Sequence, residues 1–170
     1  MNVSKDIERL INEIIPPDDY QHRNGFSNTH IIDKLNNQER NLVEDVLIGM
    51  LSDKTDILIV ETLAYLQSIK SLPILYTLFD KKIEESAKII IAASIFQINK
   101  DNQMLEIAIN AFKDLEKLKD AYYVYRLLPM FYYLRKFNNK TTDEIIKEYV
   151  NHSEYLLSYN AKQILGILPS

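Results

Sequence analysis

Histidines and paired carboxylates are the side chains of this sequence with the greatest potential for chemistry. His22, His30 and His152 lie far apart, and none belongs to an HExxH pattern or another recognised metal-ligand spacing. A metal or substrate site would require His22 and His30 to converge with Asp18 or Asp19 near an N-terminal loop. Positions in surface loops explain these histidines more simply, so we expect no metal site and no catalytic histidine.

Acidic pairs are the next candidates, as partners in general acid and base catalysis. They are Asp18 with Asp19, Glu44 with Asp45, Glu84 with Glu85, and Asp143 with Glu144. Adjacent residues of a helix do not share a face, so such a pair does not present two carboxylates to one substrate. The sequence also lacks cysteine and any GxGxxG or Walker loop. We therefore predict no catalytic residue, no metal, no cofactor and no enzymatic activity.

Tyrosines in the segment AYYVYRLLPMFYYLRKF, residues 121–137, are better candidates for a binding surface. Helical spacing predicts a core stripe of Val124, Leu127, Leu128, Phe131 and Leu134. Four tyrosines then lie mainly on the flanks of that stripe: Tyr122, Tyr125, Tyr132 and Tyr133. Tyrosine combines a large apolar ring with a hydroxyl and is enriched at interface hot spots. We predict that these residues bind a protein partner; the alternative is that the rings pack against adjacent helices.

A second candidate surface consists of positions that point away from the core on successive helices. Its members are Glu44, Tyr76, Asp80, Glu106 and Asn110. A 30-residue repeat, described below, predicts that Tyr76 lies near Glu106 and Asp80 near Asn110. Such an acidic, partly aromatic strip would suit a basic partner, because complementary charge raises association rate and selectivity. The alternative is an ordinary solvated face.

The elements that position these residues are all predicted to be helices. Apolar spacing predicts a helix over residues 3–15 that ends at Pro16 and Pro17, a short helix capped by Ser27 or Asn28, and a longer one over residues 38–52. Later segments continue the helical pattern to a final helix, SEYLLSYNAKQILGIL, residues 153–168. No segment shows the alternation of a β-strand, so the fold class is all-α.

An internal repeat organises these helices into pairs. The segment LQSIKSLPILYTLFD, residues 66–80, aligns with FQINKDNQMLEIAIN, residues 96–110, and places Ser71 on Asp101. Both residue types cap helix N-termini, which predicts the same turn in both repeats. A third pair spans residues 121–150, with a capping box predicted from Thr141 and Glu144. Helix pairs at this period are typical of an α-solenoid.

The segments NGFSNTHIIDKL, LVEDVLIGML and IVETLAYLQS, with Pro129 inside a later helix, carry a resemblance to the HEAT-repeat superfamily over about residues 26–168. The resemblance implies a short right-handed α-α superhelix of antiparallel helix pairs. It implies one domain over residues 1–170, in which residues 1–22 form an N-terminal helix and loop. Residues 23–170 then form about four helix pairs, including a terminal half-unit.

The distribution of charge along the chain and the HEAT-like resemblance together indicate what kind of function to expect. Residues 1–60 carry 6 Lys and Arg against 11 Asp and Glu, an imbalance that disfavours binding to nucleic acid phosphates. No segment has the character of a secretory signal or a membrane span, so we expect a cytoplasmic protein without membrane contact. The sequence is similar to short bacterial HEAT-like proteins, some of which are immunity proteins.

We therefore predict a non-catalytic module that binds a protein, most specifically an immunity protein that inhibits a cognate toxin, whose interacting domain would be basic. An adaptor or scaffold of a cellular complex is the alternative. A HEAT-like DNA glycosylase or bilin lyase is the third reading, and a glycosylase of this kind would need a Lys and Arg excess that is missing here. The sequence does not determine the oligomeric state.

Overall fold

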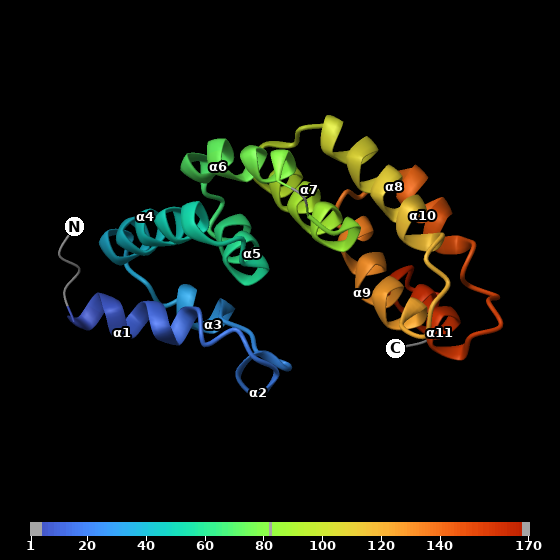
Figure 1. The fold of residues 1–170 in the computed structure, drawn as a ribbon, viewed down its shortest axis with the longest axis horizontal. Coiled ribbons are helices and arrows are strands. Elements are labelled where there is room, and N and C mark those ends of the chain that lie inside the picture. Colours follow the sequence, from blue (N-terminus) through green and yellow to red (C-terminus); the bar gives the residue numbers. More distant parts are fainter. Residues whose placement is uncertain (1–4, 82, 168–170) are drawn as a thin grey trace. The chain divides into compact units, whose positions relative to one another are not determined.

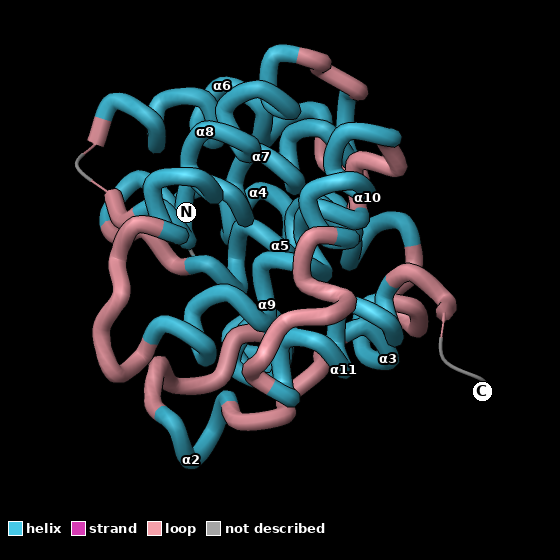
Figure 2. Tube along the Cα trace, turned by 90° about the vertical axis from the view of Figure 1, so that its right-hand side faces the viewer, coloured by secondary structure: helices cyan, strands magenta, loops and turns pink. Residues whose placement is uncertain are grey.

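The chain folds entirely from helices within the part that can be described. A computed structural model describes residues 5–81 and 83–167, which form eleven α-helices and two short 3-10 helices and contain no β-strand (Figure 1, Figure 2). The prediction of an all-α fold is confirmed. The chain divides into two compact units, Met1–Thr77 and Leu78–Ser170, which we call unit 1 and unit 2 and describe separately.

Unit 1 is built around one long helix, α4. Its elements are α1 (Lys5–Ile14), α2 (Tyr20–Arg23), α3 (Thr29–Ile32), α4 (Asn37–Asp53), α5 (Ile57–Tyr65), the 3-10 helix η1 (Ile69–Ser71) and α6 (Leu72–Thr77). Helix α4 begins with a capping box in which Asn36 and Glu39 satisfy each other's backbone N–H groups. It packs against α1, α5 and α6 and buries Val43, Leu47 and Leu51 in the core.

The predicted cap of the short helix α3 is only partly correct. Asn28 stands at the N-cap position, but its side chain makes no capping hydrogen bond there. Instead, the buried Nδ2 of Asn28 donates to the carbonyl of Ile14 at 3.0 Å and to Oγ1 of Thr62 at 2.7 Å. This amide therefore ties the end of α1 to the middle of α5, because a buried polar group needs hydrogen-bond partners.

Unit 2 is organised around α7. Its elements are the 3-10 helix η2 (Leu78–Asp80), α7 (Glu85–Asn99), α8 (Gln103–Glu116), α9 (Tyr123–Arg135), α10 (Lys140–Lys147) and α11 (Tyr155–Ile164). Every residue of α7 from Ile89 to Ile95 is buried, and the helix packs against both α8 and α9. A helix that is apolar all round has no solvent face, so α7 forms the centre of this unit.

Helix α9 joins the remaining helices of unit 2 to this centre. It packs against α7, α8, α10 and α11. An aromatic cluster fills the space beside it: the ring centroids of Phe131 and Tyr149 lie 4.8 Å apart, and those of Phe112 and Phe131 lie 6.1 Å apart. The hydroxyl of the buried Tyr149 donates a hydrogen bond to the carboxylate of Glu116. The cluster therefore connects α8, α9 and the segment after α10.

The repeat predicted from the sequence does not produce two equal turns. Asp101 accepts a hydrogen bond from the backbone N–H of Gln103 at the start of α8, close to the predicted cap. Ser71, however, lies inside η1, and Ser68 supplies the cap there. The prediction of a shared turn is therefore wrong. The cap of α10 is likewise Asn139, which accepts from the N–H of Thr141, and not Thr141 itself.

Within the described ranges, no helix combines the length and the apolar character required to cross a membrane.

Candidate functional site

A row of exposed tyrosines runs along the side of α9 opposite its core residues. The buried side consists of Leu127, Met130, Phe131 and Leu134, whereas Val124 and Leu128, predicted for the core, are only half-buried. Three of the four predicted tyrosines are strongly exposed: Tyr122 by 69%, Tyr125 by 66% and Tyr132 by 60%. Positions three and seven apart lie on one side of a helix. We call these three residues the α9 tyrosine face; the fourth, Tyr133, is half-buried beside it.

A shallow groove lies beside this face, between α9 and α11. It has a volume of about 530 Å³ and is lined by Leu128, Pro129, Tyr132, Tyr133, Asn160 and Ile164. The ammonium of Lys136 lies at its edge, 5.2 Å from the ring centroid of Tyr132 and 4.8 Å from that of Tyr133. The groove is thus mainly apolar, with aromatic walls and one positive charge in cation–π contact with them.

Pro129 stands in the middle of the α9 tyrosine face. It is exposed and lies inside the helix, so its ring adds apolar surface to this side of α9. Proline has no N–H, and the carbonyl of Tyr125 therefore cannot receive the usual helical hydrogen bond from residue 129.

Helix α11 carries a second aromatic surface, which the sequence analysis did not single out. Tyr155 is 71% exposed and Tyr159 and Leu156 are each 41% exposed. The two tyrosine rings stack with their centroids 5.7 Å apart, and Gln163 donates a hydrogen bond to the hydroxyl of Tyr159. We call Tyr155, Leu156 and Tyr159 the α11 tyrosine face. Two tyrosines four residues apart, opposite the buried Leu157 and Ala161, were the signal for it.

The members of the predicted acidic strip are distributed over both units. Glu44 and Tyr76 belong to unit 1 and are half-buried, and the carboxylate of Glu44 forms an ion pair with Lys70 at 3.2 Å. Asp80, Glu106 and Asn110 belong to unit 2 and are exposed. Glu106 and Asn110 share one face of α8, since they lie four residues apart. The strip as one shared surface, with Tyr76 near Glu106 and Asp80 near Asn110, stays a prediction.

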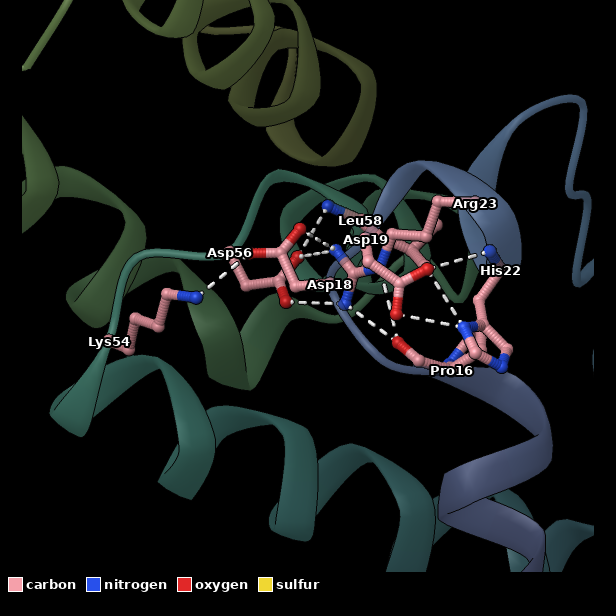
Figure 3. A network of polar contacts seen from close by, with 8 residues as sticks. All are labelled: Pro16, Asp18, Asp19, His22, Arg23, Lys54, Asp56 and Leu58. Atoms are coloured by element: carbon pink, nitrogen blue, oxygen red, sulfur yellow. Dashed lines mark hydrogen bonds and ion pairs between the residues drawn. The ribbon is translucent and has the colours of Figure 1, made fainter.

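The N-terminal loop contains a network of polar contacts centred on Arg23 (Figure 3). The guanidinium donates to both carboxylate oxygens of Asp56 at 2.8 Å and also to the carbonyl of Pro16. Asp56 in turn caps α5 by accepting from the N–H of Leu58. Lys54 pairs with Asp18 at 2.8 Å. The network fixes residues 16–24 to the start of α5.

The electrostatics of this network indicate a structural role. The pKa of Asp18 is lowered by its hydrogen bond from Lys54 and by the charge of Arg23, and the pKa of Asp19 is lowered by hydrogen bonds from His22. The pKa of Arg23 is raised, chiefly by its hydrogen bond to Asp56. A general acid or base works best with a pKa near the ambient pH. Each of these shifts moves the pKa of its group further from neutral pH. The groups therefore stay charged, which favours permanent ion pairs over proton transfer.

The two histidines considered for a metal site have separate surroundings. His22 Nδ1 contacts Asp19 at 2.8 Å, whereas His30 lines a different depression together with Leu10, Glu13 and Lys34. Across residues 5–81 and 83–167, no three His, Cys, Asp or Glu side chains are grouped to hold a metal ion.

Comparisons of this chain with protein-family models, with curated proteins and with solved structures find no match.

Proposed function

We propose that this protein is a non-catalytic module that binds another protein through the exposed tyrosines of unit 2. The observation that carries the proposal is the α9 tyrosine face, where three rings stand 60–69% exposed on one side of a helix. The α11 tyrosine face adds two further rings from the same unit.

The physical argument concerns what a tyrosine ring gains on burial. An exposed ring leaves apolar surface in water, and a partner that covers it recovers the hydrophobic free energy while its hydroxyl keeps a hydrogen bond. Tyrosine has few side-chain torsions, so ordering it costs little conformational entropy. Helix α9 is also packed against four other helices, which fixes the backbone that carries the rings before binding. Preorganisation of this kind improves affinity.

Within this class, we favour a HEAT-like immunity protein of the cytoplasm that inhibits a cognate basic toxin. The resemblance of the sequence and the acidity of unit 1 support this version. Unit 1 has 7 Lys and Arg against 12 Asp and Glu, a net charge of −5, which would attract a basic partner. An adaptor or scaffold in a cellular complex is the second candidate, and it uses the same tyrosines without inhibition.

Affinity capture with matched variants tests the proposal. The tagged chain, the Tyr122→Ala/Tyr125→Ala/Tyr132→Ala variant and the Tyr155→Ala/Tyr159→Ala variant are each used to capture proteins from the source cells. Tyr20→Ala is the control, because Tyr20 is 80% exposed but belongs to unit 1. We expect a stoichiometric partner that the control retains and that at least one unit 2 variant loses while its circular dichroism stays helical. Equal capture by all four proteins contradicts the proposal.

The identity of the captured protein then separates the two candidates. A single basic protein whose toxicity or activity falls on addition of this chain supports the immunity function. A multi-subunit complex whose activity is unchanged supports the scaffold.

A further inference from the structure

We propose that the tyrosine faces of unit 2 bind an acidic segment of the partner protein, whose carboxylates pair with the lysines beside the tyrosine rings. This inference rests on the proposed function and specifies the chemistry of the partner's contact surface. The observation that carries it is an asymmetry of charge. Helices α9 and α11, which bear the exposed tyrosines, contain two Arg and one Lys but no Asp or Glu, although unit 2 as a whole is nearly neutral.

The two arginines of α9 are already paired with carboxylates of neighbouring segments. The guanidinium of Arg126 donates to both carboxylate oxygens of Asp120, at 2.7 and 2.9 Å. That of Arg135 donates to both oxygens of Asp143, each at 2.7 Å. A bidentate pair of this kind satisfies both charges and leaves little for a partner to bind. The charge that this part of unit 2 offers to a partner therefore resides in its lysines.

Lys162 stands on the same side of α11 as the tyrosines of that helix. It follows Tyr159 by three positions and Tyr155 by seven, a spacing that places the three side chains on one side. Within the described ranges, Lys162 forms no ion pair with a carboxylate. Glu154, at the N-cap of α11, is eight residues away, or about 12 Å at 1.5 Å per residue. A partner that covers the two rings therefore also meets an ammonium.

Lysines also flank the α9 tyrosine face. The ammonium of Lys119, an exposed residue that precedes α9, lies 3.7 Å from the ring centroid of Tyr123. After the other end of the helix, the ammonium of Lys136 lies 5.2 Å from the ring centroid of Tyr132. Cation–π contacts position both ammonium groups against aromatic rings. Carboxylates of a partner can pair with these lysines while its apolar groups cover the rings.

The tyrosine hydroxyls favour the same chemistry. In the part of the chain that the structure describes, the hydroxyls of the most exposed tyrosines of unit 2 form no hydrogen bond within the protein: Tyr122, Tyr125, Tyr132 and Tyr155. A phenol hydroxyl donates a hydrogen bond, and a carboxylate only accepts. Such charge-assisted bonds are stronger than neutral ones. The mainly apolar groove between α9 and α11 would accept an apolar side chain of the same segment.

A single-stranded nucleic acid is another polyanion that tyrosines and lysines can bind, through base stacking and phosphate contacts. Its affinity depends on how many phosphates are neutralised. Both arginines of α9 are paired within unit 2, whose net charge is only +1, so the charges favour an acidic protein segment. A basic toxin also carries carboxylates, and this assignment is therefore compatible with attraction of its basic surface by unit 1.

Charge reversal tests the inference on the captured partner. The full-length Lys119→Glu/Lys162→Glu variant is compared with Lys113→Glu/Lys147→Glu, which makes the same change of charge at exposed lysines of α8 and α10. We expect the first variant to raise the Kd for the partner by at least about tenfold and the control by less than about threefold. Lys119→Arg/Lys162→Arg keeps both charges and should bind like the native chain. All variants should keep a helical circular dichroism spectrum.

A synthetic probe tests the same chemistry without the partner. Fluorescence anisotropy compares a labelled peptide of alternating Glu and Phe, a neutral peptide of alternating Ser and Phe, and an oligo-dT of about 15 nucleotides. We expect the native chain to bind the acidic peptide most tightly, and both Lys119→Glu/Lys162→Glu and Tyr155→Ala/Tyr159→Ala to weaken that binding. Equal binding of the neutral peptide overturns the inference. Tighter binding of oligo-dT that the same variants lose overturns it in favour of a nucleic acid.

The outcomes separate this inference from the proposed function. A partner that the tyrosine variants lose but Lys119→Glu/Lys162→Glu retains leaves the proposed function standing and overturns the inference. Equal capture by the native chain and all tyrosine variants contradicts the proposed function, even where the acidic peptide still depends on the lysines.

Discussion

The hydroxyl of Tyr149 is the polar atom of the buried aromatic cluster, and it makes unit 2 sensitive to alkaline pH. Burial and the neighbouring carboxylate of Glu116 both raise the pKa of Tyr149 above the ordinary value of about 10. The unfolded chain releases this proton above that pH, whereas the folded chain retains it. The stabilising contribution is therefore complete below about pH 10 and is lost as the pH rises further.

Replacement of Tyr149 by Phe should remove this dependence. We expect the free energy of unfolding of the native chain to fall more steeply above pH 10 than that of Tyr149→Phe, by up to about 1.4 kcal/mol per pH unit. Urea titrations between about pH 9 and 11.5 measure the two slopes. Tyr20→Phe is the control, because Tyr20 is 80% exposed, and its slope should match the native one. Parallel slopes for native and Tyr149→Phe would contradict the assignment.

For single residues, the sequence predicted which side chains are exposed on a helix, but it did not predict their hydrogen-bond partners. Helical periodicity separated the exposed Tyr122, Tyr125 and Tyr132 from the core, because it depends only on the positions of residues around one helix. The sequence predicted Ser27 or Asn28 as the cap of α3, and Asn28 stands at that position without making the capping hydrogen bond. Its actual partners lie 14 and 34 residues away, and local sequence contains no information about such contacts.

Helix α5 begins at a residue that also anchors another segment of the chain. The side chains of Arg23 and Asp56 are 19% and 10% exposed, so their bidentate ion pair is largely removed from water. A paired, partly buried charge becomes destabilising when its counter-charge is removed. The start of α5 and the loop of residues 16–24 therefore depend on one guanidinium.

We expect Arg23→Met to lower the free energy of unfolding by about 2–3 kcal/mol, through lost charged hydrogen bonds and an unpaired Asp56. Lys54→Met is the matched control. It removes the neighbouring ion pair with Asp18, but both side chains are more than half exposed and water replaces the contact. Chemical denaturation followed by circular dichroism compares the two. A loss of stability in Lys54→Met as large as that in Arg23→Met would show that Asp56 does not need its partner.

Helix positions were predictable from the sequence, but the turns between them were not. The prediction over residues 38–52 corresponds to α4 at Asn37–Asp53, where apolar spacing and the cap agree. In the repeat, by contrast, α5 ends at Tyr65 and Gln67 adopts a left-handed φ of 57°, whereas α7 continues to Asn99 and its left-handed residue is Lys100. The two aligned segments therefore form different turns, because the residue at which a helix ends depends on tertiary packing as well as on caps.

The charge of the molecule is concentrated in one unit. Unit 1 has a net charge of −5, while unit 2 has 13 Lys and Arg against 12 Asp and Glu, a net charge of +1. Neither unit has the excess of cations that releases counterions from a phosphate backbone. We therefore expect no retention of duplex DNA in a filter-binding assay at low salt. Retention that weakens steeply with added salt would instead favour the glycosylase reading.

For the whole molecule, the all-α fold class was predictable from the sequence, whereas the arrangement of the helix pairs stays a prediction. The sequence predicts helices and not strands because apolar residues recur at intervals of three and four positions, as in α8 and α9. They indicate which side of a helix is buried, but they do not identify the helix that covers it. The solenoid therefore stays a proposal, as do the acidic residues Glu44, Asp80 and Glu106 as a shared surface.

The burial of α7 has a consequence for how this protein can evolve. Seven consecutive positions, from Ile89 to Ile95, have no solvent face, and a change of volume at any of them disturbs packing. The rings of the α9 and α11 tyrosine faces project from the same unit into water, where most substitutions leave the fold intact. Descendants of this sequence are thus free to change these exposed rings while the helix at the centre of unit 2 stays almost unchanged.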